Sequence, residues 1–195
     1  GGGIVISNTS EQLTHLVESL NAPITNTLMG LGGISGVHPN FVGMLGMHGT
    51  LEANKAMANA DVILALGARF DDRVTNNVKK FCPNATIVHV DVDPTSISKT
   101  IKAHIPVVGC LATVLEQLQA GIDKSPIKID RSAQEDWWRQ IISWREQKCL
   151  SYNTDGDKIK PQAVIEAVYK ATNGDAYVSS DVGQHQMFAA QYYPF

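Results

Sequence analysis

Cysteine is scarce in this sequence, and so are long apolar runs and clusters of like charge. The 195 residues include three cysteines, Cys82, Cys110 and Cys149, an odd number at wide spacings, which excludes a disulfide framework and gives no zinc-binding pattern. The longest apolar stretches fall far short of the ~20 residues that cross a bilayer, so we expect no membrane partner. Basic residues form no run longer than Lys79-Lys80 and the formal net charge is −3, so we expect no nucleic-acid partner.

What remains is the composition of an ordinary globular protein, with 44% hydrophobic and 18% charged residues. A chain of this length can bury a core of its own. The first residue, Gly1, is not a methionine, no signal-peptide pattern follows it, and the last residues, Tyr193-Pro194-Phe195, carry no obvious stop signal. We therefore expect the sequence to be an internal segment of a longer protein.

Residues 1–122 alternate helix-like and strand-like segments, which predicts an α/β fold with a doubly wound, mainly parallel sheet. Apolar residues at helical spacing predict helices, the first of them starting at Asn8 with Glu11 three residues on. Two continuous apolar runs, 62–66 and 86–90, are typical of a parallel sheet covered on both faces. The predicted helices span 8–20, 50–59 and 111–118, and the predicted strands 23–27, 62–66, 86–90 and 105–108, with a glycine-rich loop over 30–49.

From residue 123 the alternation breaks. Residues 123–159 read as a linker with one helix, which begins at a capping box of Ser132 and Glu135 and carries three tryptophans. Residues 160–195 read as the truncated start of a second α/β domain, with a helix from Pro161 and a strand at 177–179.

Four unusual loops follow predicted strands. Open parallel sheets bind ligands outside the carboxyl ends of their strands, so these loops mark the candidate site. Glycines let a ligand approach the backbone, arginines offer forked donors to a diphosphate, and an Asp at a strand end accepts from ribose hydroxyls. Together they predict a nucleotide-cofactor site. The loops are residues 30–49, 67–73, 91–94 and 109–110.

Each loop taken alone has a plainer interpretation. Gly1-Gly2-Gly3 can be a simple turn, and it lacks the spacing of the G-x-G-x-x-G fingerprint, which disfavours an ordinary NAD site. The charged residues of 67–73 can be a solvated loop. His48 and His185 have no second ligand at metal spacing, so zinc is not expected.

Three longer motifs resemble those of the acetohydroxyacid synthase (acetolactate synthase) family, catalytic subunit. They are residues 44–50 (MLGMHGT), 67–75 (GARFDDRVT) and 182–187 (VGQHQM). Lys160-Pro161-Gln162 and Ala189-Ala190-Gln191 also fit, and the resemblance covers the whole chain in the right order. It implies three α/β domains, of which this chain contains the middle one without its first strand, and the opening of the third.

The resemblance implies FAD on the middle domain, thiamine diphosphate at the start of the next, and Mg²⁺ with ligands outside this segment. Arg69 is implied nearest the FAD diphosphate, and Asp91 and Val92 on the adenosine side. The residues implied to contact FAD are Gly1, Gly2, Gly3, Thr27, Leu28, Met29, Leu45, Gly46, Met47, His48, Gly67, Arg69, Asp71, Arg73, Val74, Asp91, Val92 and Gly109, with Gln186 and Met187 reaching the flavin from the third domain. Those implied to contact thiamine diphosphate are Val182, Gly183, Gln184 and His185.

The same resemblance implies that no catalytic residue and no metal ligand lies here. The family's catalytic Glu belongs to the first domain, its Gly-Asp-Gly…Asn metal motif lies further along the third, and its active site forms between two subunits. Three positions depart from the family pattern: Cys110 stands in place of Asp, Phe188 in place of Trp and Ser180 in place of Thr.

The implied parent enzyme decarboxylates pyruvate and condenses the two-carbon unit with pyruvate or 2-oxobutyrate, in branched-chain amino-acid biosynthesis. The implied partners are other catalytic subunits, as a homodimer or tetramer, and a small regulatory subunit. The compartment would be the cytoplasm in a bacterium and an organelle in a plant or fungus. Two alternatives stay open: another FAD-containing thiamine-diphosphate enzyme, of the glyoxylate carboligase or pyruvate oxidase type, and a non-catalytic nucleotide-binding module. The segment alone is expected to be inactive.

Overall fold

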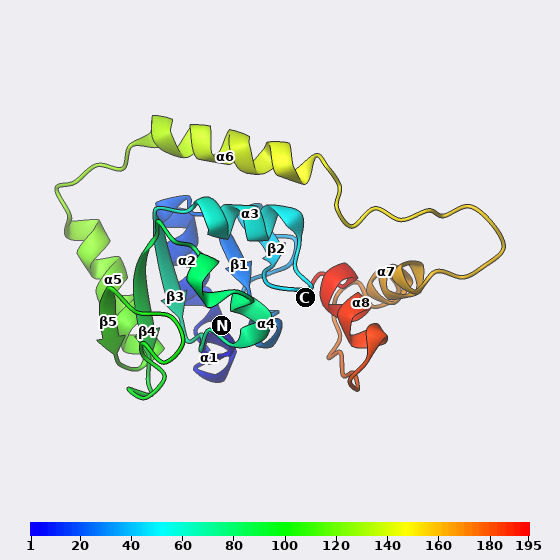
Figure 1. Ribbon diagram of the computed structural model, residues 1–195, viewed down its shortest axis with the longest axis horizontal. Helices are drawn as coiled ribbons and strands as arrows, with labels where there is room; N and C mark the ends of the chain where they lie inside the picture. The colour runs from blue at the N-terminus through cyan, green and yellow to red at the C-terminus, as the bar shows by residue number, and fades with distance from the viewer.

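A computed structural model describes all of residues 1–195, and its elements alternate in the α/β manner (Figure 1). In chain order the elements are α1 (Gly2–Ile6), α2 (Ser10–Leu20), β1 (Ile24–Asn26), η1 (Leu28–Gly30), β2 (Phe41–Met44), α3 (Leu51–Asn59), β3 (Val62–Leu66), α4 (Asp72–Thr75), η2 (Val78–Lys80), β4 (Thr86–Asp91), β5 (Ile105–Val108), α5 (Leu111–Lys124), α6 (Arg131–Arg145), α7 (Pro161–Thr172) and α8 (Gln184–Tyr192).

All strand pairing is parallel, as the sequence predicts, but the strands form two sheets. β1 pairs with β2, and β3, β4 and β5 form a second sheet in that order. β5 lies at an edge of its sheet, which suits Pro106, a residue without a backbone donor. β1 and β3 each have one edge that pairs with no strand.

The largest core cluster joins the second sheet to α1, α2 and α5. Leu66 of β3 and Val90 of β4 pack with Leu13, Leu16 and Val17, the predicted apolar face of α2. Ile4, Leu111 and Leu115 complete the contact and are almost fully buried. The opposite face of the sheet carries Ile63, Ala65 and Ile87, which pack with Phe70 and Cys82.

Coverage of the second sheet is less complete than the apolar runs predict. Side chains alternate between faces along a strand, so Val62 and Leu64 share the face of Leu66. That face is covered at the carboxyl end only: Leu66 is 8% exposed, while Val62 is 56% exposed. The expectation of a sheet covered on both faces is therefore wrong at the amino end of β3, where the strand forms an edge and no helix packs over it.

The helix expected in the linker packs on the first part of the chain. α6 lies against α3, and Ile141 is fully buried with Val42, Ala53 and Ala56 (Figure 1). The tryptophans of α6 pack around the same cluster, as their helical spacing predicts. α6 begins differently from the prediction: Asp130, not Ser132, is the N-cap, because its Oδ1 accepts from the main-chain N–H groups of Ser132 and Ala133.

Three other expectations about local structure are wrong. The glycine-rich stretch 30–49 contains β2, whose Gly43 has a φ of +98°, a value that glycine adopts without strain. Tyr177-Val178-Ser179 forms no strand and Tyr177 is fully exposed, because no neighbouring strand is present to pair with this run. The helix expected from Asn8 begins at Ser10, with Thr9 as its N-cap.

The predicted starts of α3, α5 and α7 are confirmed, whereas α5 continues to Lys124, beyond its predicted end at residue 118, and α1, α4 and α8 were not predicted. α7 starts at Pro161 and ends at Asn173, whose left-handed conformation closes the helix. α3 starts after Thr50, whose side chain accepts from the N–H of Ala53. No helix is both long enough and apolar enough to span a bilayer.

Candidate functional site

The predicted loops gather at the carboxyl ends of the strands. Because every strand pair is parallel, the residues after β1, β3, β4 and β5 leave their sheets at corresponding ends. The main chain confirms this for the second sheet, since Gly67 N–H donates to Val90 and Gly109 N–H donates to Asp91. Gly67, Asp91 and Gly109 therefore stand in a row along one edge.

The amino-terminal glycines join this edge through close main-chain contact. The N–H of Gly3 donates to the carbonyl of Gly67 at 3.1 Å, and the amine of Gly1 donates to the carbonyl of Leu66 at 2.7 Å. A Cβ on Gly3 would come within 2.7 Å of the Gly67 Cα. Gly3 therefore lets α1 pack closely against the loop after β3, a reason for glycine that the sequence alone does not give.

The segment after β1 lies on the other side of the same glycines. A Cβ on Gly2 would stand 3.1 Å from the Cβ of Met29, and a Cβ on Gly30 would meet the main chain of Gly1. The structure thus brings Gly1–Gly3, Thr27–Met29 and Gly67 into one neighbourhood, as predicted for a shared ligand.

The loop after β2 is joined to the loop after β3. Met47 N–H donates to the carbonyl of Arg73 at 2.8 Å, and Gly46, with a φ of +95°, lies so close that a Cβ would clash with that carbonyl. Leu45 is buried and its N–H donates to Asn26, at the end of β1. The two motif segments 44–50 and 67–75 are therefore one structural unit.

The charged side chains of the 67–73 loop reach outward. The Arg69 side chain is 78% exposed, and its one ion pair, with Asp71 at 3.4 Å, is too exposed to hold it firmly. Asp71 also caps α4 by accepting from the Val74 N–H. Arg73 is exposed and its guanidinium lies 4.0 Å from the Met47 sulfur. Both arginines are thus available to an anion.

Asp91 ends β4 on the same edge and lies near Gly1. Burial lowers the pKa of the Gly1 amine from 8.0 to about 6, and the nearby Asp91 carboxylate offsets part of that effect. The Asp91 carboxylate accepts from the N–H of Asp93, and Val92 is largely exposed. An acid and exposed apolar surface at a strand end suit a ribose and a base.

The amino end of α5 faces the same edge. Cys110 is its N-cap and provides no side-chain hydrogen bond, so the N–H groups of the first turn keep their capacity to donate. The dipole of this 14-residue helix favours negative charge at that end. The Cys110 thiol is exposed.

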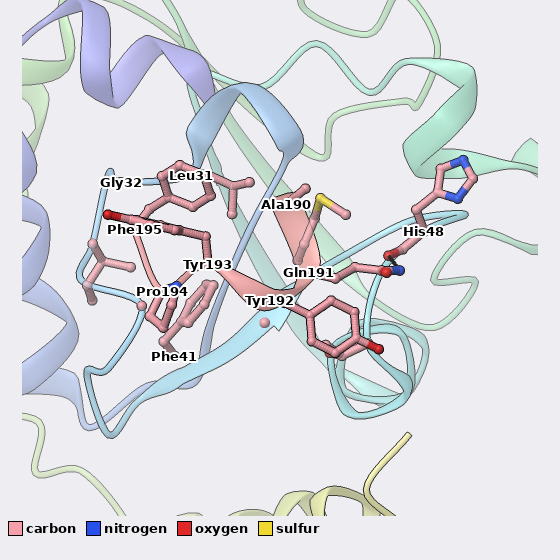
Figure 2. Close-up of a pocket in the computed structure, with 15 residues that line it drawn as sticks. Leu31, Gly32, Phe41, His48, Ala190, Gln191, Tyr192, Tyr193, Pro194 and Phe195 are labelled. Atoms are coloured by element: carbon pink, nitrogen blue, oxygen red, sulfur yellow. Dashed lines mark hydrogen bonds between the residues drawn. The ribbon is translucent and has the colours of Figure 1, made fainter. Parts of the chain in front are cut away.

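A cavity of about 110 Å³ lies where the end of the chain meets the loop after η1 (Figure 2). Phe41, Tyr193 and Phe195 line it, and Figure 2 shows these rings together on one side, with Gln191 and His48 on the other. The amide of Gln191 donates to the main-chain carbonyl of His48 at 2.8 Å. Predicting this cavity from sequence would have required knowing that α8 docks beside β2.

The remaining predicted residues, Val182–Met187, lie at the amino end of α8, which starts at Gln184. Gly183 is the N-cap, the residues from Val182 to His185 are exposed, and Gln186 and Met187 are half-buried. The contact between α8 and the first part of the chain runs through the other end of the helix, at Ala190 and Gln191. The structure does not bring Val182–His185 to the edge that carries Gly67 and Asp91.

The sequence did not indicate two buried polar side chains beside the site. His89 is fully buried in β4 and its Nε2 lies 2.7 Å from the carbonyl oxygen of Ala68. Asn26, at the end of β1, is 4% exposed and its Nδ2 has no hydrogen-bond partner. A polar residue inside an apolar strand was the available signal for His89.

The chain is similar to known proteins over its whole length. Residues 1–118 match the family described as thiamine pyrophosphate enzyme, central domain. The whole chain is similar to the acetolactate synthase isozyme 3 large subunit of Escherichia coli (56% identity), and to the acetolactate synthase large subunit of Haemophilus influenzae (52% identity), and covers 34% of each. It is also similar to the chloroplastic acetolactate synthase 1 of Oryza sativa, at 41% identity over 30% of that protein. The chain thus spans about a third of the length of these relatives.

Proposed function

The chain belongs to the thiamine pyrophosphate enzyme family, and we propose that it is the middle part of an acetolactate synthase large subunit. The proposed activity of the parent protein is decarboxylation of pyruvate and transfer of the two-carbon unit to pyruvate or 2-oxobutyrate. Whole-chain similarity to synthase large subunits from bacteria and a plant supports it.

We propose further that residues 1–122 bind FAD along the carboxyl edge. One observation carries this: the bonds Gly3–Gly67 and Met47–Arg73 unite the glycine segment and the two central motifs at that edge. The donor set fits the cofactor, since Arg69 and the open end of α5 offer positive charge to a diphosphate, and Asp91 offers an acceptor to a ribose.

Within this proposal Gly1–Gly3, Thr27–Met29 and Gly67 lie closest to the diphosphate and Arg69 pairs with it, while Asp91, Val92 and Gly109 take the adenosine. Leu45–His48, Asp71, Arg73 and Val74 form the side toward the flavin. Gln186 and Met187 reach the flavin, and Val182–His185 reach the thiamine diphosphate, once the third domain is complete. When bound, thiamine diphosphate supplies the electron sink for decarboxylation, and this chain positions and shields the reacting groups.

Other parts of the parent are proposed to supply what this segment does not. We assign the Mg²⁺ ligands and the catalytic Glu to the rest of the parent, as the family resemblance implies. Further catalytic subunits and a small regulatory subunit are the proposed partners, and the cytoplasm of a bacterium the proposed compartment.

A segment exchange tests the activity. This chain would replace the matching third of the Escherichia coli isozyme 3 large subunit, with which it aligns over all 195 residues. We expect the chimera to form acetolactate from pyruvate. A folded chimera that binds thiamine diphosphate but yields another product, such as acetyl phosphate from pyruvate or tartronate semialdehyde from glyoxylate, would favour the other FAD-containing enzymes.

FAD binding is tested on the 195-residue chain and on the chimera by quenching of flavin fluorescence. Arg69→Ala should weaken binding about five- to tenfold, because a charge-assisted contact to phosphate is lost. The matched control is Arg139→Ala on α6, an exposed arginine paired with Asp136, which should leave binding unchanged. Equal effects of the two substitutions, or no binding to either protein, would contradict the assignment of FAD to this edge.

A further inference from the structure

His89 is a fully buried imidazole in the middle of β4. Its Nε2 lies 2.7 Å from the carbonyl oxygen of Ala68, in the loop after β3. A carbonyl oxygen only accepts, so Nε2 carries the proton and Nδ1 is left as an acceptor. Nδ1 has no hydrogen-bond partner. A buried unpaired acceptor costs stability that an apolar side chain would not cost, so the bond from Nε2 to Ala68 is the contact that an apolar residue at this position could not make.

The loop that receives this bond has an uncommon conformation. Gly67 and Phe70 both have positive φ, +55° and +53°, and the left-handed region is unfavourable for a bulky side chain such as that of Phe70. The Phe70 ring packs edge-on against the His89 ring, with centroids 4.9 Å apart, and against Phe81 at 5.9 Å. His89 therefore contacts the loop twice, at the main chain of Ala68 and at the ring of Phe70.

The residue between these two contacts is Arg69. Its neighbours on both sides are fixed on the imidazole, while its own side chain is 78% exposed and has one weak ion pair. Ala68 also lies beside Gly1, where a Cβ would come within 2.7 Å of the Ala68 Cα. The direction in which the Arg69 side chain leaves the loop is thus set by the contacts of its two neighbours with His89 of β4, and not by partners of its own guanidinium group.

We propose that His89 is a positioning residue for the cofactor loop. It donates from Nε2 to the Ala68 carbonyl, supports Phe70 in its left-handed conformation, and so presents Arg69 to an anionic ligand. That the ligand is FAD rests on the function proposed above. The contact of His89 with the loop does not depend on the identity of the ligand and is tested by a separate measurement.

Two substitutions of matched length separate the donor from the packing. In His89→Gln the side-chain amide can reach the position of Nε2 and donate to Ala68, whereas His89→Met has a similar length and no donor. Trypsin cleaves after Arg69, so the rate of cleavage there reports how often the loop opens. Cleavage after Lys158, which lies in an exposed coil, serves as the internal reference.

The expected result is cleavage after Arg69 that rises roughly three- to tenfold in His89→Met relative to Lys158, and stays near the wild-type rate in His89→Gln. Equal rates in the two variants, whether both unchanged or both raised, would overturn the role of the donor. The wild-type protein offers a check that needs no variant. Its His89 imidazole should show the Nε2–H tautomer in ¹⁵N correlation spectra, and an Nδ1–H tautomer would overturn the proposal.

FAD titration of the same proteins separates this inference from the proposed function. Weaker binding in His89→Met, with rescue in His89→Gln, would support both. If the wild-type chain and the chimera bind no FAD but cleavage after Arg69 still rises in His89→Met and not in His89→Gln, the positioning role of His89 is supported and the cofactor assignment is refuted. Unchanged cleavage with normal FAD binding would refute His89 as a positioning residue and leave the cofactor assignment intact.

Discussion

The main-chain N–H of Met47 donates a hydrogen bond to the carbonyl of Arg73, with 2.8 Å between nitrogen and oxygen. This bond connects the loop after β2 with the loop after β3, which belong to different sheets. Since β1 and β3 do not pair, such loop contacts help to fix the position of one sheet relative to the other. Substitutions near this bond should therefore affect both stability and the proposed cofactor site.

Gly46→Ala should be strongly destabilising. Gly46 has a φ of +95°, and a Cβ would stand 2.4 Å from the Arg73 carbonyl oxygen, so the added methyl must push the two loops apart. We expect a loss of about 2–3 kcal/mol in the free energy of unfolding in urea. The control is Gly121→Ala within α5, where a Cβ meets nothing within 4 Å and the helix should gain about 0.5–1 kcal/mol. Similar changes in both variants would contradict the packing at Gly46.

The stability of the 195-residue chain should fall as the pH is lowered from 8 to 6. Burial lowers the pKa of the Gly1 amine from 8.0 to about 6, so the unfolded chain binds a proton in this window that the folded chain excludes. The loss is at most about 3 kcal/mol by pH 6.

Urea unfolding at several pH values measures this slope, and the control carries one extra residue ahead of Gly1. In that chain the Gly1 nitrogen is a peptide N–H and does not titrate, so its slope should be smaller. The same pH dependence in both chains would show that other groups, such as the histidines, cause it.

The three thiols should react with iodoacetamide in a fixed order at pH 8. Cys110 and Cys149 are both exposed, but partial burial raises the pKa of the Cys149 thiol, so Cys110 should react first and Cys149 more slowly. Burial raises the pKa of Cys82 to about 11, so only about a thousandth of it is thiolate at this pH.

Mass spectrometry of time points follows each cysteine. If FAD lies across the amino end of α5, it should slow the labelling of Cys110 and leave Cys149 unchanged. Equal labelling of Cys110 with and without bound FAD would move the adenosine away from α5.

Thr50→Val should cost about 2 kcal/mol of unfolding free energy. The buried Thr50 hydroxyl donates to the Val42 carbonyl at 2.8 Å and accepts from the Ala53 N–H at 3.1 Å, so the isosteric valine leaves two main-chain groups unpaired. Thr50→Ser keeps the hydroxyl and loses only a methyl group, and it should be the milder change in urea unfolding. A serine variant less stable than the valine variant would mean that packing against Gly43 matters more than capping.

Elements with a strong local signal could be predicted from the sequence. The continuous apolar runs of β3 and β4, the apolar face of α2 and the Pro161 start of α7 lie where the pattern puts them. That the loops after β3, β4 and β5 meet at one edge follows from parallel pairing and needed no further information.

Elements that depend on a distant partner could not be predicted. β2 exists because Phe41–Met44 finds β1, with an irregular register, while Tyr177–Ser179 has similar propensity and no strand to pair with. The sequence pattern predicts Ser132 as the cap of α6, but Asp130 caps the helix because its carboxylate accepts from two main-chain N–H groups. The role of His89 depends on a main-chain carbonyl, which no sequence pattern reveals.

The packing of α6 on α3 also keeps the carboxyl-terminal residues of the chain close to the surface that they contact. Ile141 anchors α6 beside the β2 region, and a long coil connects α6 to α7, which α8 follows (Figure 1). The residues from Ala190 to Phe195 therefore meet the loops around Gly32 and His48 as tethered neighbours, at an effective concentration on the order of millimolar. At that concentration a contact as small as the Gln191–His48 hydrogen bond and a few aromatic rings can stay formed, although the same surfaces on separate molecules would rarely associate.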